Sequence, residues 1–276
     1  LILQACSSPC LPAEKFTLDE PLLKAIRKGD VGEAKQHIAR MNGINCMKAL
    51  MSYIKTATRT GHEGVIELLI SQAPTEESKA EVANAVLCYV TSYGNEKLVR
   101  HYLARKSGNP SEAFVAAANQ GHIGIAKILL DAGADIHFEQ DNALEEAAVW
   151  ANVEMVRFLL DKGADANASY KEEPILYYAL SPNPLEAPDD APDAQFWRDR
   201  KAVVGLLLKH GADPNKHGFT SRDGEDLGTA LHRLCLMSPR VVPSAKQVQI
   251  GKMLLKAGVA INALKGTAST ALRVAV

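Results

Sequence analysis

The sequence has little of what usually marks a membrane protein or a nucleic-acid-binding protein. Aromatic residues make up 5% of the chain, and no apolar run approaches the roughly twenty residues of a transmembrane helix. The formal net charge is −1, so no overall field attracts nucleic acid or an anionic membrane surface. We therefore expect neither membrane insertion nor a nucleic-acid partner.

The five cysteines are odd in number and irregularly spaced, apart from Cys6 and Cys10. Such thiols are typical of a reducing, cytosol-like compartment and do not form a disulfide framework. They also lack the clustering that a metal site requires. Cys46, Cys88 and Cys235 lie among apolar residues, which predicts small side chains packed in a core. We expect a cytoplasmic protein without a bound metal.

The most informative pattern present is a motif that returns along the second half of the chain. Residues 121–135 read GHIGIAKILLDAGAD, residues 151–165 read ANVEMVRFLLDKGAD, and its end recurs at 206–213 and 253–262. Each copy has apolar residues at helical spacing, followed by a glycine that suits a left-handed helix C-cap. A short apolar helix precedes it, and the Gly-His or similar pair between the two helices forms a corner of the chain. Self-similarity at this period predicts a solenoid of helix pairs.

These units resemble ankyrin repeats. The middle motif of that family is matched by AANQGH at 117–122, its opening motif by TALH at 229–232, and its loop start by DAN at 165–167 and DPN at 213–215. The resemblance implies an all-α ankyrin-repeat solenoid of about seven helix-pair units plus a partial eighth. The units would be joined by short loops, the fingers.

The same alignment gives the domain organisation. Residues 1–17 are an N-terminal extension and 18–276 the repeat domain, with degenerate repeats at 18–110 and well-formed ones at 111–276. The units lie at 18–40, 47–72, 79–105, 111–138, 142–169, 173–216 and 228–263, and an eighth begins at Thr267. The first three units lack the Gly-Ala-Asp motif, so another class of helix-pair solenoid stays open for them.

Two units carry inserts, near 182–200 and 238–245. The first insert has four prolines and four acidic residues between Pro182 and Asp193. This composition excludes a helix interior and predicts an exposed loop. Inserted loops are often functional. Neutral drift is the alternative, because a longer surface loop costs little stability.

The sequence contains no Gly-rich phosphate loop, no nucleophile elbow and no His-Glu metal pattern. His62, His122 and His232 occupy repeat positions, which predicts that their side chains hydrogen-bond to loop backbone. The aspartates of Gly-Ala-Asp are likewise repeat structure. We therefore expect no catalytic residue, no cofactor and no enzyme activity.

In ankyrin stacks the first helices line a concave face, and the fingers project beside it. Contacts with a partner are expected before the corners, at Arg27, Arg59, Tyr93, Gln120, Trp150 and Met237, and in the fingers, at Phe138, Tyr170, Phe219 and Arg222. A tryptophan at a usually polar position indicates an exposed anchor, unless Trp150 packs on the irregular sixth unit. We expect Phe138 and Tyr170, at successive fingers, either to form one aromatic ledge or to pack one finger against the next.

The sequence thus predicts a scaffold that binds a partner protein or peptide through the concave groove and finger loops. One alternative is the recognition module of a larger enzyme or bacterial effector whose catalytic part lies outside these residues; a secreted effector would act in the host cytosol. Another is a nucleic-acid or anionic-ligand binder that uses Arg27, Lys28, Arg59 and Arg100. The lack of interleaved aromatic and basic residues counts against that alternative.

Overall fold

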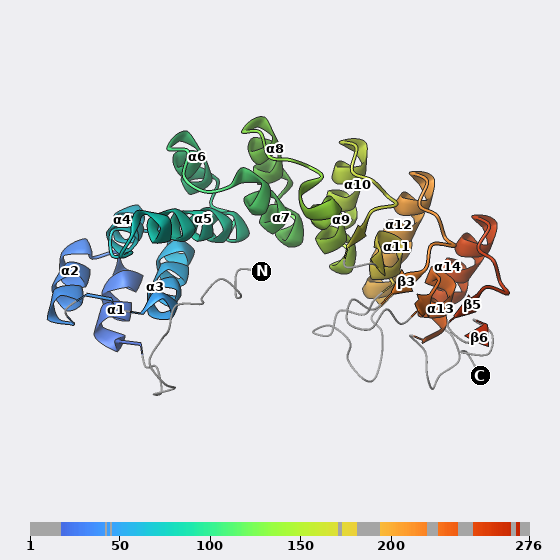
Figure 1. Cartoon of the computed structure of the whole chain (residues 1–276), viewed down its shortest axis with the longest axis horizontal. Coiled ribbons are helices and arrows are strands. Elements are labelled where there is room, and N and C mark those ends of the chain that lie inside the picture. Colours follow the sequence, from blue (N-terminus) through green and yellow to red (C-terminus); the bar gives the residue numbers. More distant parts are fainter. Residues whose placement is uncertain are drawn as a thin grey trace. The chain divides into compact units, whose positions relative to one another are not determined.

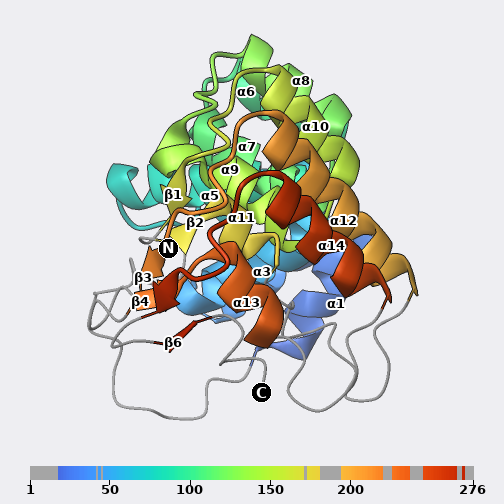
Figure 2. The ribbon, with the colours of Figure 1, turned by 90° about the vertical axis from the view of Figure 1, so that its right-hand side faces the viewer.

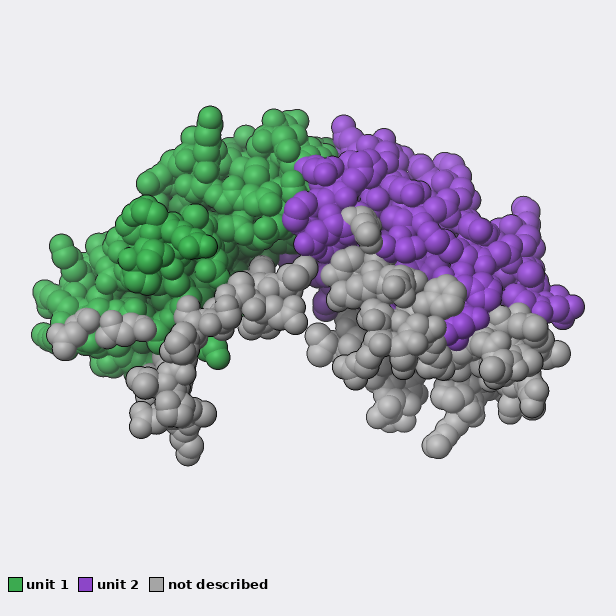
Figure 3. All heavy atoms as spheres, in the orientation of Figure 1, with its two compact units in different colours: residues 1–117, 124–134 green, residues 118–123, 135–276 purple. Residues whose placement is uncertain are grey.

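The computed structural model describes residues 18–41, 43–44, 46–170, 173–180, 194–219, 226–236, 245–265 and 269–270. Within these residues the chain forms fourteen helices, α1 to α14, in seven consecutive pairs (Figure 1). The predicted all-α fold of stacked helix pairs is confirmed. The chain divides into two compact units, residues 1–117 with 124–134 and residues 118–123 with 135–276 (Figure 3). The repeat pattern did not predict this division.

Unit 1 contains the first three helix pairs. Their bounds are α1 Glu20–Lys28, α2 Val31–Arg40, α3 Met47–Thr60, α4 Glu63–Ile70, α5 Glu76–Ser92 and α6 Glu96–Ala104. Helix α3 packs between α1 and α5, and α2 packs on α4, so the first helices form one layer. The fourth pair, α7 (Pro110–Gln120) and α8 (Ile123–Asp131), is divided between the two units.

Unit 2 contains the last three pairs and three short antiparallel hairpins. The helices are α9 Phe138–Val149, α10 Val153–Asp161, α11 Ile175–Tyr178, α12 Ala194–Lys209, α13 Ala230–Leu236 and α14 Ala245–Lys256. The hairpins pair β1 (Ser169–Tyr170) with β2 (Glu173–Pro174), β3 (Gly218–Phe219) with β4 (Asp226–Gly228), and β5 (Leu264–Lys265) with β6 (Ser269–Thr270). Because β2 contacts β3 and β4 contacts β5, the hairpins lie in a row (Figure 2).

The corners between paired helices follow from two adjacent residues. Gly29 and Gly121 have φ of 77° and 74°, in the left-handed region that glycine enters without a steric penalty. At some corners the next residue then caps the second helix with its side chain. Asp30, which follows Gly29, accepts a hydrogen bond at Oδ1 from the backbone N–H of Glu33 at 2.8 Å, and Asn152, which follows Ala151, caps α10 in the same way. At these corners one dipeptide ends one helix and starts the next.

The paired leucines of the second helices supply much of the core. Leu159 and Leu160 of α10 are both buried, and Leu207 and Leu254 are fully buried at the matching positions. The second leucine is less buried in the later copies, since Leu208 is half-buried and Leu255 of α14 is 46% exposed. Its face is uncovered because α14 is the last second helix in the described part of the chain.

The prediction that three cysteines pack in the core is fully confirmed for Cys88. Cys88 is buried, whereas Cys46 and Cys235 are half-buried, and all three are free thiols. Burial raises the pKa of the Cys88 thiol to about 12, with a smaller contribution from the charge of Glu112. A thiol of that kind is inert and acts as an apolar side chain.

The aspartates that end each Gly-Ala-Asp motif shape the following loop. Asp165 Oδ1 accepts a hydrogen bond from the backbone N–H of Asn167 at 2.8 Å. Asp213 Oδ1 accepts one from Asn215 at the same distance. Each aspartate thereby closes a turn with its own backbone two residues on. The prediction that these residues are repeat structure is confirmed.

The predicted inserts fall largely outside the described residues. Helix α12 begins at Ala194, so the last part of the first predicted insert is helical and belongs to the sixth pair. Helix α14 begins at Ala245, where the second predicted insert ends. The predicted extension 1–17 also lies outside the described residues. Of the predicted eighth unit, the structure describes only residues 269–270 in β6.

Candidate functional site

The predicted partner-binding residues of unit 2 lie at successive corners. Gln120 ends α7, and Trp150 follows the last residue of α9. Gln120 is exposed, and its side-chain amide donates a hydrogen bond to Asn119. Asn119 in turn donates one to Glu146 of α9. This polar chain fixes the end of α7 against α9 and leaves Gln120 at the surface.

Trp150 is the C-cap residue of α9, and its side chain is half-buried. The next residue, Ala151, occupies the corner position that is glycine in other pairs, with φ of 51°. A left-handed conformation costs a non-glycine residue about 1–2 kcal/mol. The carbonyl of Val149, just before Trp150, accepts a hydrogen bond from Arg200 at 3.1 Å. A long-range contact therefore helps to hold the corner that carries Trp150.

Arg200 of α12 is a residue that the sequence analysis missed. Its side chain is 1% exposed, and Nη1 also donates to the carbonyl of Ala179 at 2.9 Å. The guanidinium thus satisfies carbonyls at the C-terminal ends of α9 and α11, where helix dipoles favour a cation. An arginine within a helical pattern is by default an exposed residue, so no sequence signal marked it.

The predicted finger residues do not all lie in loops. Phe138 is half-buried and begins α9, so it belongs to a first helix. Tyr170 lies in β1 and Phe219 in β3, as expected of finger residues. Arg222 and Met237 lie outside the described residues. The aromatic ledge of Phe138 and Tyr170 stays a prediction.

A buried carboxyl group lies in the first turn of α9, the helix that Phe138 begins. Asp141 is 5% exposed, and its Oδ1 lies 3.0 Å from Nδ1 of His137. The same oxygen accepts a hydrogen bond from the backbone N–H of Asp165 at 3.3 Å. Burial raises the pKa of Asp141, while these two neighbours act in the opposite direction. The pair ties the start of α9 to the loop after α10.

Polar and aromatic side chains also meet around the second hairpin. The guanidinium carbon of Arg233 in α13 lies 5.1 Å from the ring centre of Tyr177 in α11, which is a cation–π contact. Burial raises the pKa of Tyr177, and the charge of Arg233 lowers it. At the hairpin, His217 Nδ1 lies 2.9 Å from Asp226 Oδ1. The sequence analysis did not single out these pairs, because their partners are separated in sequence.

The predicted residues of unit 1 are exposed at the ends of the first helices. Arg27 of α1 pairs with Glu20 at 3.0 Å. Arg59 of α3 is exposed and has no charged partner among the residues that the structure describes. Tyr93 is the C-cap residue of α5 and is 37% exposed. These side chains are accessible to a partner.

The structural role predicted for the histidines is confirmed for two of them. His62 Nε2 lies 3.2 Å from the carbonyl of Arg27. His232 is buried, and its Nδ1 accepts a hydrogen bond from the backbone N–H of Thr229 at 3.2 Å. In the described part of the chain, no three His, Cys, Asp or Glu side chains gather as a metal site would need. No helix there is long and apolar enough to cross a membrane.

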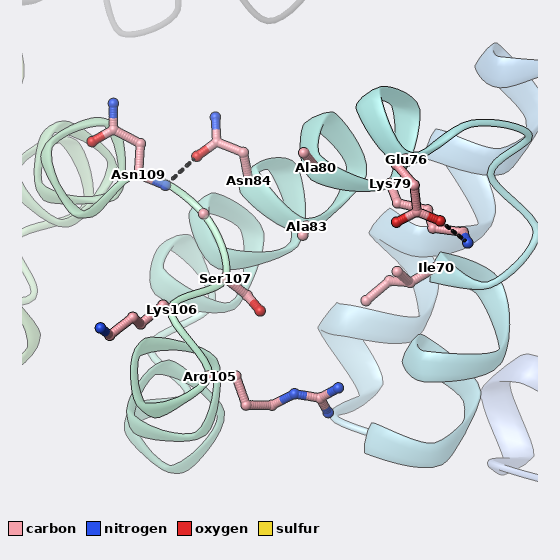
Figure 4. A pocket seen from close by; sticks show the side chains of 11 residues that line it. Ile70, Glu76, Lys79, Ala80, Ala83, Asn84, Arg105, Lys106, Ser107 and Asn109 are labelled. Atoms are coloured by element: carbon pink, nitrogen blue, oxygen red, sulfur yellow. Dashed lines mark hydrogen bonds and ion pairs between the residues drawn. The ribbon is translucent and has the colours of Figure 1, made fainter.

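Unit 1 also contains a pocket of about 620 Å³ between the start of α5 and the segment that joins α6 to α7 (Figure 4). Small and apolar side chains line it together with polar ones and three cations, Lys79, Arg105 and Lys106. Two of these cations are already paired, Lys79 with Glu76 at 2.6 Å and Arg105 with Glu67 at 2.9 Å. Lys106 has no charged partner among the described residues, so the pocket presents one unpaired cation to a ligand.

Comparisons with known proteins agree with this geometry. Residues 87–170 match the family model described as ankyrin repeats, in three copies. The crystal structure of the human ASB11 ankyrin repeat domain aligns with a TM-score of 0.55 and 20% sequence identity. That alignment covers 88% of this chain and 99% of the other. At this identity the likeness concerns the fold.

Curated relatives match parts of the chain. The Caenorhabditis elegans protein "Ankyrin repeat and KH domain-containing protein mask-1" is 28% identical over 202 residues, which are 72% of this chain and 6% of that protein. "Ankyrin repeat, SAM and basic leucine zipper domain-containing protein 1" of Mus musculus is 37% identical over 108 residues, and that of Otolemur garnettii 38%. The chain spans 20% of the length of each of these two relatives.

Proposed function

The chain belongs to the ankyrin repeat family, and from this we propose that it is a scaffold that holds a partner protein or peptide. Ankyrin repeat domains are generally protein-interaction modules and are typically non-catalytic. No catalytic domain is evident in the residues that the structure describes. In our proposal the partner contacts the first helices and the hairpins of unit 2, with Trp150 as its main anchor.

The accessibility of Trp150 is the observation that carries this proposal. The large aromatic side chains of the core, such as Tyr53 and Phe114, are almost completely buried, whereas Trp150 keeps part of its surface in contact with solvent. A rigidly held, partly exposed tryptophan loses little conformational entropy on binding. Such residues supply much of the free energy of protein association. The contact of Arg200 with Val149 supports the required rigidity.

The lengths of the relatives support one addition to this proposal. The chain spans 6% of the nematode relative and 20% of the mouse relative, and both names include domains other than ankyrin repeats. We propose that these repeats serve as the recognition module of a larger protein. The relatives named above are animal proteins and give no support to a bacterial effector. The free thiols favour a reducing, cytoplasmic setting.

Capture of a partner from cell lysate tests the proposal. The chain, its Trp150→Ala variant and a Lys162→Ala control would be immobilised in equal amounts, and captured proteins would be quantified by mass spectrometry. Loss of a hot-spot contact of about 2 kcal/mol predicts a roughly thirtyfold weaker interaction for Trp150→Ala. Lys162 is exposed and unpaired within the described residues, so its variant should capture the partner normally. Equal capture by all three folded proteins would contradict the role of Trp150.

A further inference from the structure

The first helices of unit 1 carry a stripe of positive charge. On α3, Lys48, Lys55 and Arg59 are spaced at i, i+7 and i+11, which places them on one face of the helix. All three are exposed, whereas the opposite face of α3 is buried. Lys24 is exposed on α1, the helix that packs against α3. We call these four residues the basic strip.

The acidic residues nearby in sequence are already engaged elsewhere. Asp19 caps α1 and Asp30 caps α2. Glu20 pairs with Arg27 at 3.0 Å, and Glu33 pairs with Lys28 at 3.5 Å. No acidic residue occurs between Glu33 and Glu63. Each acidic residue of α1 and α2 and of their N-caps is therefore a helix cap or an ion-pair partner.

The four cations of the basic strip remain unpaired within the described residues. The other cations considered in the sequence analysis differ in this respect, because Arg27, Lys28 and Arg100 each have a glutamate partner. An exposed cation without a partner is fully hydrated and free to form a new ion pair. Several such cations on adjacent helices attract a ligand with several negative charges.

We propose that the basic strip binds an acidic segment of the partner protein, a run of aspartate and glutamate side chains. This inference rests on the proposed function, since it assigns a chemical class to part of the partner. Nucleic acid fits the strip less well, because bases bind by stacking on exposed aromatic rings. The one aromatic residue of α1 and α3 is Tyr53, which is 1% exposed and accepts a hydrogen bond from the backbone N–H of Asp19.

Fluorescence anisotropy with a defined probe tests the inference. The full chain would be titrated into a labelled peptide of alternating glutamate and serine, its glutamine counterpart, and a single-stranded RNA of equal charge. The triple variant Lys48→Gln/Lys55→Gln/Arg59→Gln removes most of the strip. Its control is Lys97→Gln/Lys162→Gln/Lys252→Gln, which makes the same change in net charge at exposed cations that are unpaired within the described residues.

The strip variant should bind the glutamate peptide about tenfold more weakly, as expected for three exposed ion pairs of about 0.5 kcal/mol each. The control should change affinity less than about twofold, and added salt should weaken binding to the unaltered chain. Equal losses in both variants, or no binding of the glutamate peptide, would overturn the inference. The inference would also be overturned if the RNA bound more tightly than the peptide and the strip variant lost that binding.

These outcomes are separate from a failure of the proposed function. Partner capture in the lysate experiment depends on Trp150, which lies in unit 2, and the peptide experiment depends on residues of unit 1. If the chain captures a partner through Trp150 but does not bind the glutamate peptide, the proposed function stands and this inference is wrong. If the chain binds the peptide through the strip but captures no protein, the proposed function is wrong.

Discussion

Asn167 ties its own loop to the loop that begins at Gly211. Its Nδ2 donates a hydrogen bond to the carbonyl of Gly211 at 2.8 Å, and its Oδ1 accepts one from the backbone N–H of Asp213 at 2.7 Å. Asn215 repeats the arrangement one unit later, with the carbonyl of Gly258 at 3.0 Å. In these two units, one side-chain amide therefore sets the spacing between successive loops.

Removing one of these amides should lower stability measurably. Asn167→Ala loses two hydrogen bonds to backbone, and water replaces them in part because the site is exposed, so we expect a loss of about 1–2 kcal/mol. Asn262 is the matched control. It occupies the same motif position and makes no such bonds within the described residues, so Asn262→Ala should cost less than about 0.5 kcal/mol. Urea denaturation of both variants measures the difference, and equal costs would contradict it.

Local sequence signals were sufficient to predict the helix pairs. A glycine corner such as Gly121, a capping residue such as Asn152 and a leucine pair such as Leu159 and Leu160 each act within one or two turns of helix. A fixed period then repeats them. Where these signals were weak, as before residue 111, the ankyrin alignment of the units at 18–40, 47–72 and 79–105 still predicted the pairs.

The residues that the sequence did not reveal act over long separations. Arg200 reaches a carbonyl of α9, and Arg233 stacks on Tyr177 of the preceding unit. No periodicity encodes such contacts, because each one depends on how neighbouring units pack. The hairpins were expected only as finger loops, since strands of two or three residues show no alternation. The binding residues fall between these cases: the repeat predicted their positions, whereas the half-burial of Trp150 came from the structure.

The corner at Gly121 should tolerate no side chain. Its φ is 74°, and a Cβ atom there would lie 2.0 Å from Nδ2 of Asn152, the residue that caps α10. We expect Gly121→Ala to cost about 2–3 kcal/mol, from the left-handed conformation and from displacement of the cap. Gly133→Ala is the control, because its φ is 89° but nothing lies near its Cβ position. It should cost about 1 kcal/mol, and thermal unfolding that ranks the two variants in reverse would refute this account.

Arg200 should contribute through its hydrogen bonds and through its volume. Arg200→Met keeps much of the volume but leaves the carbonyls of Val149 and Ala179 without their donor, so we expect a loss of about 2 kcal/mol. Arg200→Ala adds a cavity and should lose about 4 kcal/mol. Lys209→Ala, at an exposed residue of the same helix, serves as a control, with an expected change below about 0.5 kcal/mol. If chemical denaturation gave similar values for Arg200→Ala and Lys209→Ala, the buried role of Arg200 would be wrong.

Asp141 should give the stability a specific pH dependence. Burial raises its pKa above the ordinary value of 3.8, so the folded state binds the proton more tightly than the unfolded state does. The resulting stability is present below the unfolded pKa and is lost as the pH rises through the folded pKa. Asn at this position does not titrate. The stability of Asp141→Asn relative to the unaltered chain should therefore rise as the pH increases from the unfolded to the folded pKa of Asp141. Above the folded pKa it should level off.

Urea denaturation at a series of pH values from about 3 to 7 measures this relative stability directly. Using the difference between the two proteins cancels the titration of all other carboxyl groups. Asp135→Asn is the control, because Asp135 is an exposed carboxyl group whereas Asp141 is buried.

 The difference between Asp135→Asn and the unaltered chain should lack the rise expected for Asp141→Asn. A constant difference for Asp141→Asn as well would show that the burial of this carboxyl group does not control its protonation.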